Sequence, residues 1–207
     1  GYLWETRNMP LTGVHDVLYV RAMSIRHHGG HVILLSLDLI GLGIGMPGRE
    51  TDVATEIRHR VAAACQMAPG NVLVATTHAH STPQTLWQSE TCTSDCEIGW
   101  LGRLIDCVVD TSISATQRYL PMTLHTGRGH VDGVAKLRTL DRTGRPFPAE
   151  HRIPVNDEEV GRLTVIWFES AAHDVLLPIL HMACHPVTVQ AQPIVSADFP
   201  GAAISSL

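Results

Sequence analysis

Two apolar runs flank a helical pattern in the segment from residue 31 to residue 76. The runs, His31–Asp38 and Asn71–Thr76, are rich in Val, Ile and Leu, which is typical of fully buried strands. Between them, Arg49–Gln66 carries Val53, Ile57, Val61 and Ala64 at a spacing close to the helical repeat. A strand, a helix and a second strand in this order form a crossover unit. The sequence therefore predicts an α/β fold in which mixed β-sheets pack with helices.

The rest of the chain supplies the other expected elements. Alternating or apolar runs predict strands, a long apolar stripe predicts a second helix, and Gly or polar clusters predict turns. A last helix should begin near residue 198, with Ser196 or Asp198 as its N-cap. The expected strands are Val14–Arg26, Pro121–Val131, Gly161–Ser170 and Val175–Ala183, the helix is Ile98–Tyr119, and the turns are His27–Gly30 and Ala171–Asp174.

Composition places the chain among folded proteins and disfavours several functions. Of 207 residues, 44% are apolar and 17% charged, so the chain can bury a core and is unlike a disordered polyelectrolyte. A net charge of −5 gives no general affinity for nucleic acid. No run has the length of a bilayer span. Because the sequence opens on Gly1 and stops at Leu207, just after a helix start, we expect an incomplete portion of one large domain.

The five cysteines leave the redox state open. Their number is odd, so at least one thiol is free or pairs outside this chain. Cys92 and Cys96 are spaced for a small disulfide loop, which an oxidising compartment would permit. No second cysteine pair or nearby histidine pair accompanies them, which disfavours a structural zinc knuckle.

Thirteen histidines are the most unusual feature of the composition, and two groups of them follow apolar runs. His78 and His80 come directly after the strand expected at residues 71–76. Ligands of open α/β sheets bind at the carboxyl ends of strands, and residues i and i+2 of an extended segment share a face. The pair is therefore suited to hold a metal ligand beside an acid–base group, although loop hydrogen bonding is an alternative interpretation.

The second group, His181 and His185, closes the apolar run that begins at Val175. Pro186 restrains His185 to extended backbone, which favours a strand end. We interpret His185 as a candidate metal ligand and His181 as a hydrogen-bonded core histidine.

Three carboxylates lie near these motifs in the sequence. Asp38 ends a buried run and would either orient a histidine or cap a turn. Asp198 is interpreted as a helix cap rather than a ligand, and Asp16 as an ordinary turn or surface residue. The chain contains no nucleophile elbow, phosphate loop or dinucleotide fingerprint.

Five short motifs, taken in order, resemble the N-terminal part of the neutral/alkaline non-lysosomal ceramidase family. The similarity runs through nearly the whole chain, and the order and spacing of the motifs make it more specific than any one of them. The motifs are Gly13-Val14-His15-Asp16, Ser36-Leu37-Asp38-Leu39, Thr77-His78-Ala79-His80-Ser81, Ala183-Cys184-His185-Pro186 and Ser196-Ala197-Asp198-Phe199-Pro200-Gly201.

This resemblance implies a layered catalytic domain and a zinc-dependent amidase of sphingolipid metabolism that cleaves the N-acyl bond of ceramide. It implies His78 and His185 as zinc ligands, and His80 and Arg138 as the residues that contact the substrate oxygen. The family's remaining ligands, a Glu and a Tyr, and its catalytic Ser would lie beyond residue 207. A lipid or other N-acyl substrate, peripheral contact with a membrane, and a secreted, periplasmic or membrane-associated location are further implications.

The chain departs from the family at the residues that follow the first histidine pair. The family continues with Ser-Gly-Pro-Gly, whereas this chain has Ser81-Thr82-Pro83-Gln84, and Leu137 replaces the family's Asn before Arg138. The loss of two glycines changes the backbone freedom beside the expected metal. Two alternatives therefore stay open: a zinc hydrolase of the same fold that acts on a different amide or an ester, and a non-catalytic relative.

Overall fold

The computed structural model describes residues 10–43, 52–83, 85, 95–135, 145, 160–174 and 176–207, with only the backbone described at 95–98. These residues form an α/β protein, as predicted, with helices and three β-sheets among them. The chain forms two compact units. Residues 1–118 and 186–207 form the first unit, and residues 119–185 form the second.

A three-stranded sheet with the order β2-β3-β4 is the centre of the first unit. Strands β2 (Val20–His27) and β3 (Gly30–Leu37) form an antiparallel hairpin, and β4 (Val72–Thr76) pairs with β3 in parallel. The hairpin turns at His28 and Gly29, which both have positive φ, at 45° and 81°. Such a two-residue turn matches the twist of the strands, and the predicted turn at this position is confirmed.

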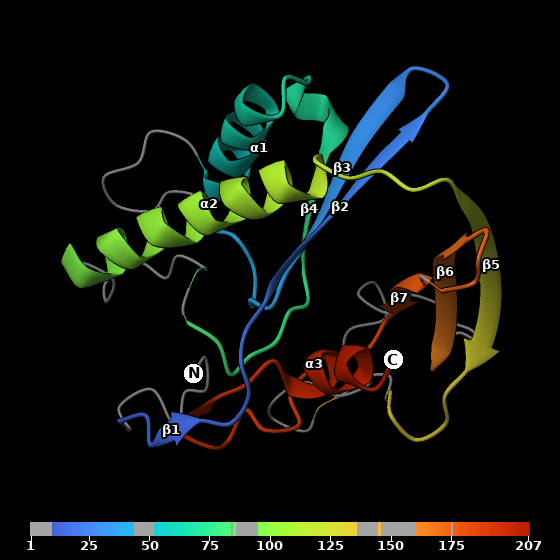
Figure 1. Ribbon diagram of the computed structural model, residues 1–207. Helices are drawn as coiled ribbons and strands as arrows, with labels where there is room; N and C mark the ends of the chain where they lie inside the picture. Colours follow the sequence, from blue (N-terminus) through green and yellow to red (C-terminus); the bar gives the residue numbers. More distant parts are fainter. Residues whose placement is uncertain are drawn as a thin grey trace. The chain divides into compact units, whose positions relative to one another are not determined.

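Helix α1 (Val53–Ala64) connects β3 to β4, which confirms the predicted crossover. Asp52 begins the helix as its N-cap, because its carboxylate accepts a hydrogen bond from the backbone N–H of Thr55 at 2.8 Å. Helix α2 is Asp95–Ala115. In Figure 1 both helices lie on the same side of the β2-β3-β4 sheet.

The core of the first unit lies between these helices and that sheet. On β3 the buried positions alternate, because only Ile33, Leu35 and Leu37 face the helices. They pack with a set of buried residues on α1, β4 and α2: Val53, Ile57, Val61, Ala62, Val72, Leu101, Ile105 and Val108.

The prediction that these two strands are fully buried was wrong. Val32 on β3 is 39% exposed and Leu73 on β4 is 59% exposed. Both side chains belong to the positions that alternate with the core-facing ones, so the described helices cover only one face of each strand. An unbroken apolar run does not distinguish this arrangement from a strand covered on both faces.

The C-terminal part of the first unit contains β8 (Ile194–Val195) and α3 (Asp198–Ser205). Strand β1 (Gly13–Val14) pairs with β8 in parallel, so the first and last described strands lie together. The N-cap of α3 is Ala197, with no side-chain cap bond, so the prediction of Ser196 or Asp198 as the cap was wrong.

The second unit contains an antiparallel sheet of β5 (Met122–His130), β6 (Arg162–Ser170) and β7 (Leu176–Met182). Strands β6 and β7 form the expected pair around residues 171–174. Among the helices of the described residues, none combines the length and the hydrophobicity that a transmembrane span requires. The cysteine pair lies outside this description, since Cys92 and the side chain of Cys96 are not described.

Candidate metal centre

The candidate site begins where β3 and β4 end side by side. Leu37 and Thr76 are register partners at the last positions of the two parallel strands. Beyond them, the N–H of Thr77 donates to the Leu37 carbonyl at 2.9 Å, and the N–H of His78 donates to the Leu39 carbonyl at 3.0 Å. The chain after β4 therefore stays against the chain after β3, and His78 comes to lie beside Leu39 and Ile40.

A hydrogen bond to the main chain fixes the chemistry of the His78 ring. Its Nδ1 lies 2.6 Å from the carbonyl oxygen of Ile40. Because a carbonyl oxygen only accepts, Nδ1 carries the proton, and Nε2 of the neutral ring keeps its lone pair. Metal-binding histidines typically donate their other ring N–H to a carbonyl or carboxylate in this way.

His78 also has an unusual backbone conformation, with a φ of 63°. This left-handed region costs a non-glycine residue about 1–3 kcal/mol, and such residues concentrate at functional sites. The sequence argument that an extended chain places His78 and His80 on one face was therefore wrong in its premise. The rings still converge, with centroids 5.0 Å apart and planes at 85°, because the chain turns at His78.

His80 is buried, with 7% of its surface exposed, and its main chain joins the C-terminal segment to this turn. Its N–H donates to the carbonyl of Pro186 at 3.4 Å, and the neighbouring Ser81 carbonyl accepts from the N–H of Ser196 at 2.8 Å. These two bonds hold the chain from residue 186 to residue 196 against the histidine turn.

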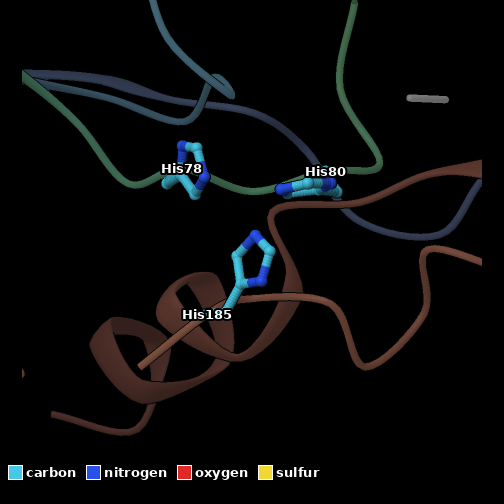
Figure 2. A group of neighbouring side chains, drawn as sticks. All are labelled: His78, His80 and His185. Carbon is cyan, nitrogen blue, oxygen red and sulfur yellow. The ribbon is translucent and has the colours of Figure 1, made fainter. Parts of the chain in front are cut away.

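His185 completes the cluster because it is bonded directly to Pro186. One ring nitrogen from each of His78, His80 and His185 lies within 4.8 Å of the other two. Figure 2 shows the ring of His185 pointing from its own segment toward the rings of His78 and His80, which share a loop. His80 is buried, whereas the other two are exposed. Among the described residues, this group alone meets the geometric criterion for a metal site.

Three imidazoles are a suitable donor set for a divalent transition metal. Imidazole nitrogen binds zinc, copper, iron and nickel, and three histidines hold the catalytic zinc of some enzymes that activate water. Nitrogens bound to one tetrahedral zinc at about 2.0–2.1 Å lie about 3.4 Å apart. In such a site the donors would approach one another by up to about 1.4 Å, and rotation of the exposed His185 ring can supply part of this movement.

Asp38 does not contact a histidine in any described interaction. Its buried carboxylate accepts hydrogen bonds from the N–H of Tyr19 at 2.9 Å and from Nη1 of Arg21 at 2.7 Å. The Arg21 guanidinium also lies over the Tyr19 ring, 5.0 Å from its centroid. Asp38 therefore fixes the end of β3, immediately before the two carbonyls that hold His78.

Asp198 holds the segment that follows His185 and Pro186. Its carboxylate accepts from the hydroxyl of Thr188, from the N–H of Val189 at 3.2 Å and from the N–H of Phe199 at 2.7 Å. Asp198 is 6% exposed and has a φ of 56°, a region that aspartate tolerates better than most residues.

Asp16 has a structural role that sequence reasoning missed. Its carboxylate accepts hydrogen bonds from the hydroxyl of Ser196 at 2.6 Å and from the N–H of Ala197 at 2.5 Å. Asp16 therefore binds the residues that begin α3, although it is about 180 positions away in the sequence. Partial burial acts to raise the pKa of Asp16, but hydrogen bonds from Ser196, His15 and Ala197 outweigh it and lower that pKa. The only sequence signal for this role was that Asp16 belongs to the Gly-Val-His-Asp motif.

The two remaining candidate residues, His181 and Arg138, have different outcomes. His181 is exposed on β7, opposite Thr164, so its interpretation as a buried core histidine was wrong. The sequence pattern correctly predicted that His181 lies on a strand, but it did not show that this face of the strand is exposed. Arg138, with its neighbours Lys136 and Leu137, lies outside the described residues.

Comparisons with known proteins do not identify the chain. No protein-family model matches the sequence, and a search of curated proteins found no match. The resemblance to neutral ceramidases remains a prediction from the motifs.

Proposed function

We propose that the chain is part of a zinc-dependent hydrolase that cleaves an N-acyl amide bond, with His78 and His185 as metal ligands. The observation that carries this proposal is the convergence of three imidazole nitrogens within 4.8 Å, at residues that stand far apart in the sequence. The hydrogen bond from His78 Nδ1 to the Ile40 carbonyl adds support, since it leaves Nε2 available as a donor.

Bound zinc would polarise an acyl carbonyl and lower the pKa of a bound water toward about 7. Residues of this chain would hold the cation and orient its ligands. His78 and His185 would hold the cation near the carboxyl ends of β3 and β4. Ile40 would keep the His78 ring in one tautomer and one orientation.

Two roles fit His80, and both place it beside the cation. The resemblance assigns its ring to the substrate oxygen, together with Arg138, and we adopt that role. Its burial supports this assignment, because a hydrogen bond to developing charge is stronger where water is excluded. The second role, a third ligand, is favoured by the approach of all three ring nitrogens to within 4.8 Å and by the three protein ligands usual at catalytic zinc.

The motifs alone indicate the substrate class, and a substrate panel tests it. Full-length protein would be purified, its metal content measured, and its hydrolysis of a panel assayed. The panel varies the head group at constant acyl chain, and includes ceramide, an N-acyl amino acid and a matched ester.

Release of fatty acid from ceramide, abolished by a chelator and restored by zinc, is the expected result. Preference for a non-sphingoid amide or an ester would support the zinc hydrolase but contradict ceramide as its substrate. Protein that binds no zinc, and whose Tm does not rise when zinc is added, would refute the proposal.

A further inference from the structure

We propose that Thr82 is a positioning residue for the metal ligand His78. Its hydroxyl holds Ile40, and Ile40 in turn holds the imidazole ring. This inference rests on the proposed function, because it assigns Thr82 a role in metal affinity as well as in folding.

The Thr82 side chain is buried, at 4% exposure, and its hydroxyl joins two segments. The oxygen accepts a hydrogen bond from the N–H of Ile40 at 3.2 Å. The hydroxyl donates to the carbonyl of Ala79 at 3.0 Å. One hydroxyl can make both bonds at once, since it offers one proton and two lone pairs.

Both polar groups of the Ile40 main chain are thereby engaged in the site. The N–H is held by Thr82, and the carbonyl accepts the Nδ1 proton of His78. Ile40 is 2% exposed, so water does not readily replace either partner. The orientation of the Ile40 carbonyl, and with it the ring of His78, depends on where Thr82 places this residue.

The second bond of Thr82 acts on the turn that carries the histidines. Ala79 stands between His78 and His80, and its carbonyl accepts the Thr82 hydroxyl proton. A turn that contains a left-handed, non-glycine residue needs surrounding contacts to keep it in that conformation. Thr82 supplies one such contact within the turn and one across to the chain after β3.

Loss of the Thr82 hydroxyl should therefore weaken metal binding without removing a ligand. Substitution of a group that orients a ligand typically costs 10–100-fold in metal affinity. Thr82 acts through Ile40 rather than on the ring itself, so we expect the lower end, about tenfold.

The test compares Thr82→Val, which keeps the side-chain shape, with Thr82→Ser, which keeps the hydroxyl. Ser112→Ala is the matched control, because Ser112 is also buried but its hydroxyl donates to the Val108 carbonyl within α2. Zinc affinity would be measured by competition with a chromophoric chelator in the full-length protein. Imidazole ¹⁵N shifts of the zinc-free protein would report the His78 tautomer, and urea unfolding would report stability.

We expect Thr82→Val to lose about tenfold in zinc affinity and to mix the His78 tautomers, while Thr82→Ser stays within about twofold. Ser112→Ala should lose stability and keep its zinc affinity. Wild-type affinity in Thr82→Val, or an equal loss in Ser112→Ala, would overturn the inference and leave the proposed function standing. No zinc binding by wild-type protein would overturn both. If Thr82→Val does not fold, Thr82→Ala replaces it: about a tenfold loss of zinc affinity is expected, and wild-type affinity would overturn the inference.

Discussion

The Nδ1 atom of His78 lies 2.6 Å from the carbonyl oxygen of Ile40, across the ends of two parallel strands. This relationship couples the sheet to the candidate metal centre. The β3–β4 register sets where Ile40 stands, and the Ile40 carbonyl sets which nitrogen of His78 carries the proton. A histidine on an unrestrained loop would have to lose that rotational freedom when it bound a metal.

Removal of either proposed ligand should abolish stoichiometric zinc binding. We expect His78→Ala and His185→Ala each to lower zinc affinity by well over 100-fold, since each removes one of the few donors. The measurement is metal content after dialysis against a fixed free zinc concentration. His181→Ala is the matched control, because His181 belongs to the same sequence group as His185 but lies outside the cluster. Equal zinc content in all three variants would contradict the assignment.

His80→Ala should separate the two roles of that residue. If its ring contacts the substrate oxygen, zinc content stays at the wild-type level and kcat falls by about 100- to 1,000-fold, as when an oxyanion contact is removed. Zinc analysis and steady-state hydrolysis on the same samples make the comparison. Loss of the metal together with activity would instead identify His80 as a third ligand.

Asp198→Ala should destabilise the protein, because it leaves the N–H of Val189 and the hydroxyl of Thr188 without their acceptor. A hydrogen bond to a charged group contributes about 1.5–3 kcal/mol, so a loss of roughly 2 kcal/mol or more is expected from urea unfolding. Asp110→Ala, at an exposed position of α2, should change stability by less than about 0.5 kcal/mol. Equal effects of the two substitutions would argue that the Asp198 contacts contribute nothing.

Asp16 should give the fold a dependence on acid pH. Its pKa is lowered in the folded state, so its stabilising effect is fully present above the unfolded value of about 3.9 and is lost as the pH falls through the folded value. Asp16→Asn should therefore be less stable than wild type near neutral pH, and the difference should shrink below about pH 4. Urea midpoints measured from pH 7 to pH 2.5 test this. A difference that stays constant over the range would contradict it.

Local sequence patterns were sufficient for most elements of the fold. The helical spacing of Val53, Ile57 and Val61 identified α1, and the break at Ala171–Asp174 between two apolar runs identified the turn between β6 and β7. These signals are strong because helix and hairpin periodicities repeat over many residues. The full burial expected for β3 and β4 failed because the number of faces that are covered is a property of tertiary packing.

The candidate site was predictable in its residues but not in its construction. His78, His80 and His185 were selected from the sequence because each follows an apolar run. The left-handed turn at His78 was not predictable, because it is held by carbonyls of Leu39 and Ile40 that no side-chain pattern reveals. The bond from Ser196 to Asp16 joins residues 180 positions apart, and a single sequence gives no signal for such a pairing.

The pairing of β1 with β8 imposes an order on biosynthesis. The second unit is encoded between the two parts of the first, so a ribosome must translate residues 119–185 before the strand partner of Gly13–Val14 exists. A nascent chain that ends before residue 194 has both early histidines, yet lacks the strand and the aspartate that secure the segment after His185. Under the proposed function, zinc would bind stably only after β8 and Asp198 have been synthesised, so chains that end before β8 should not retain zinc.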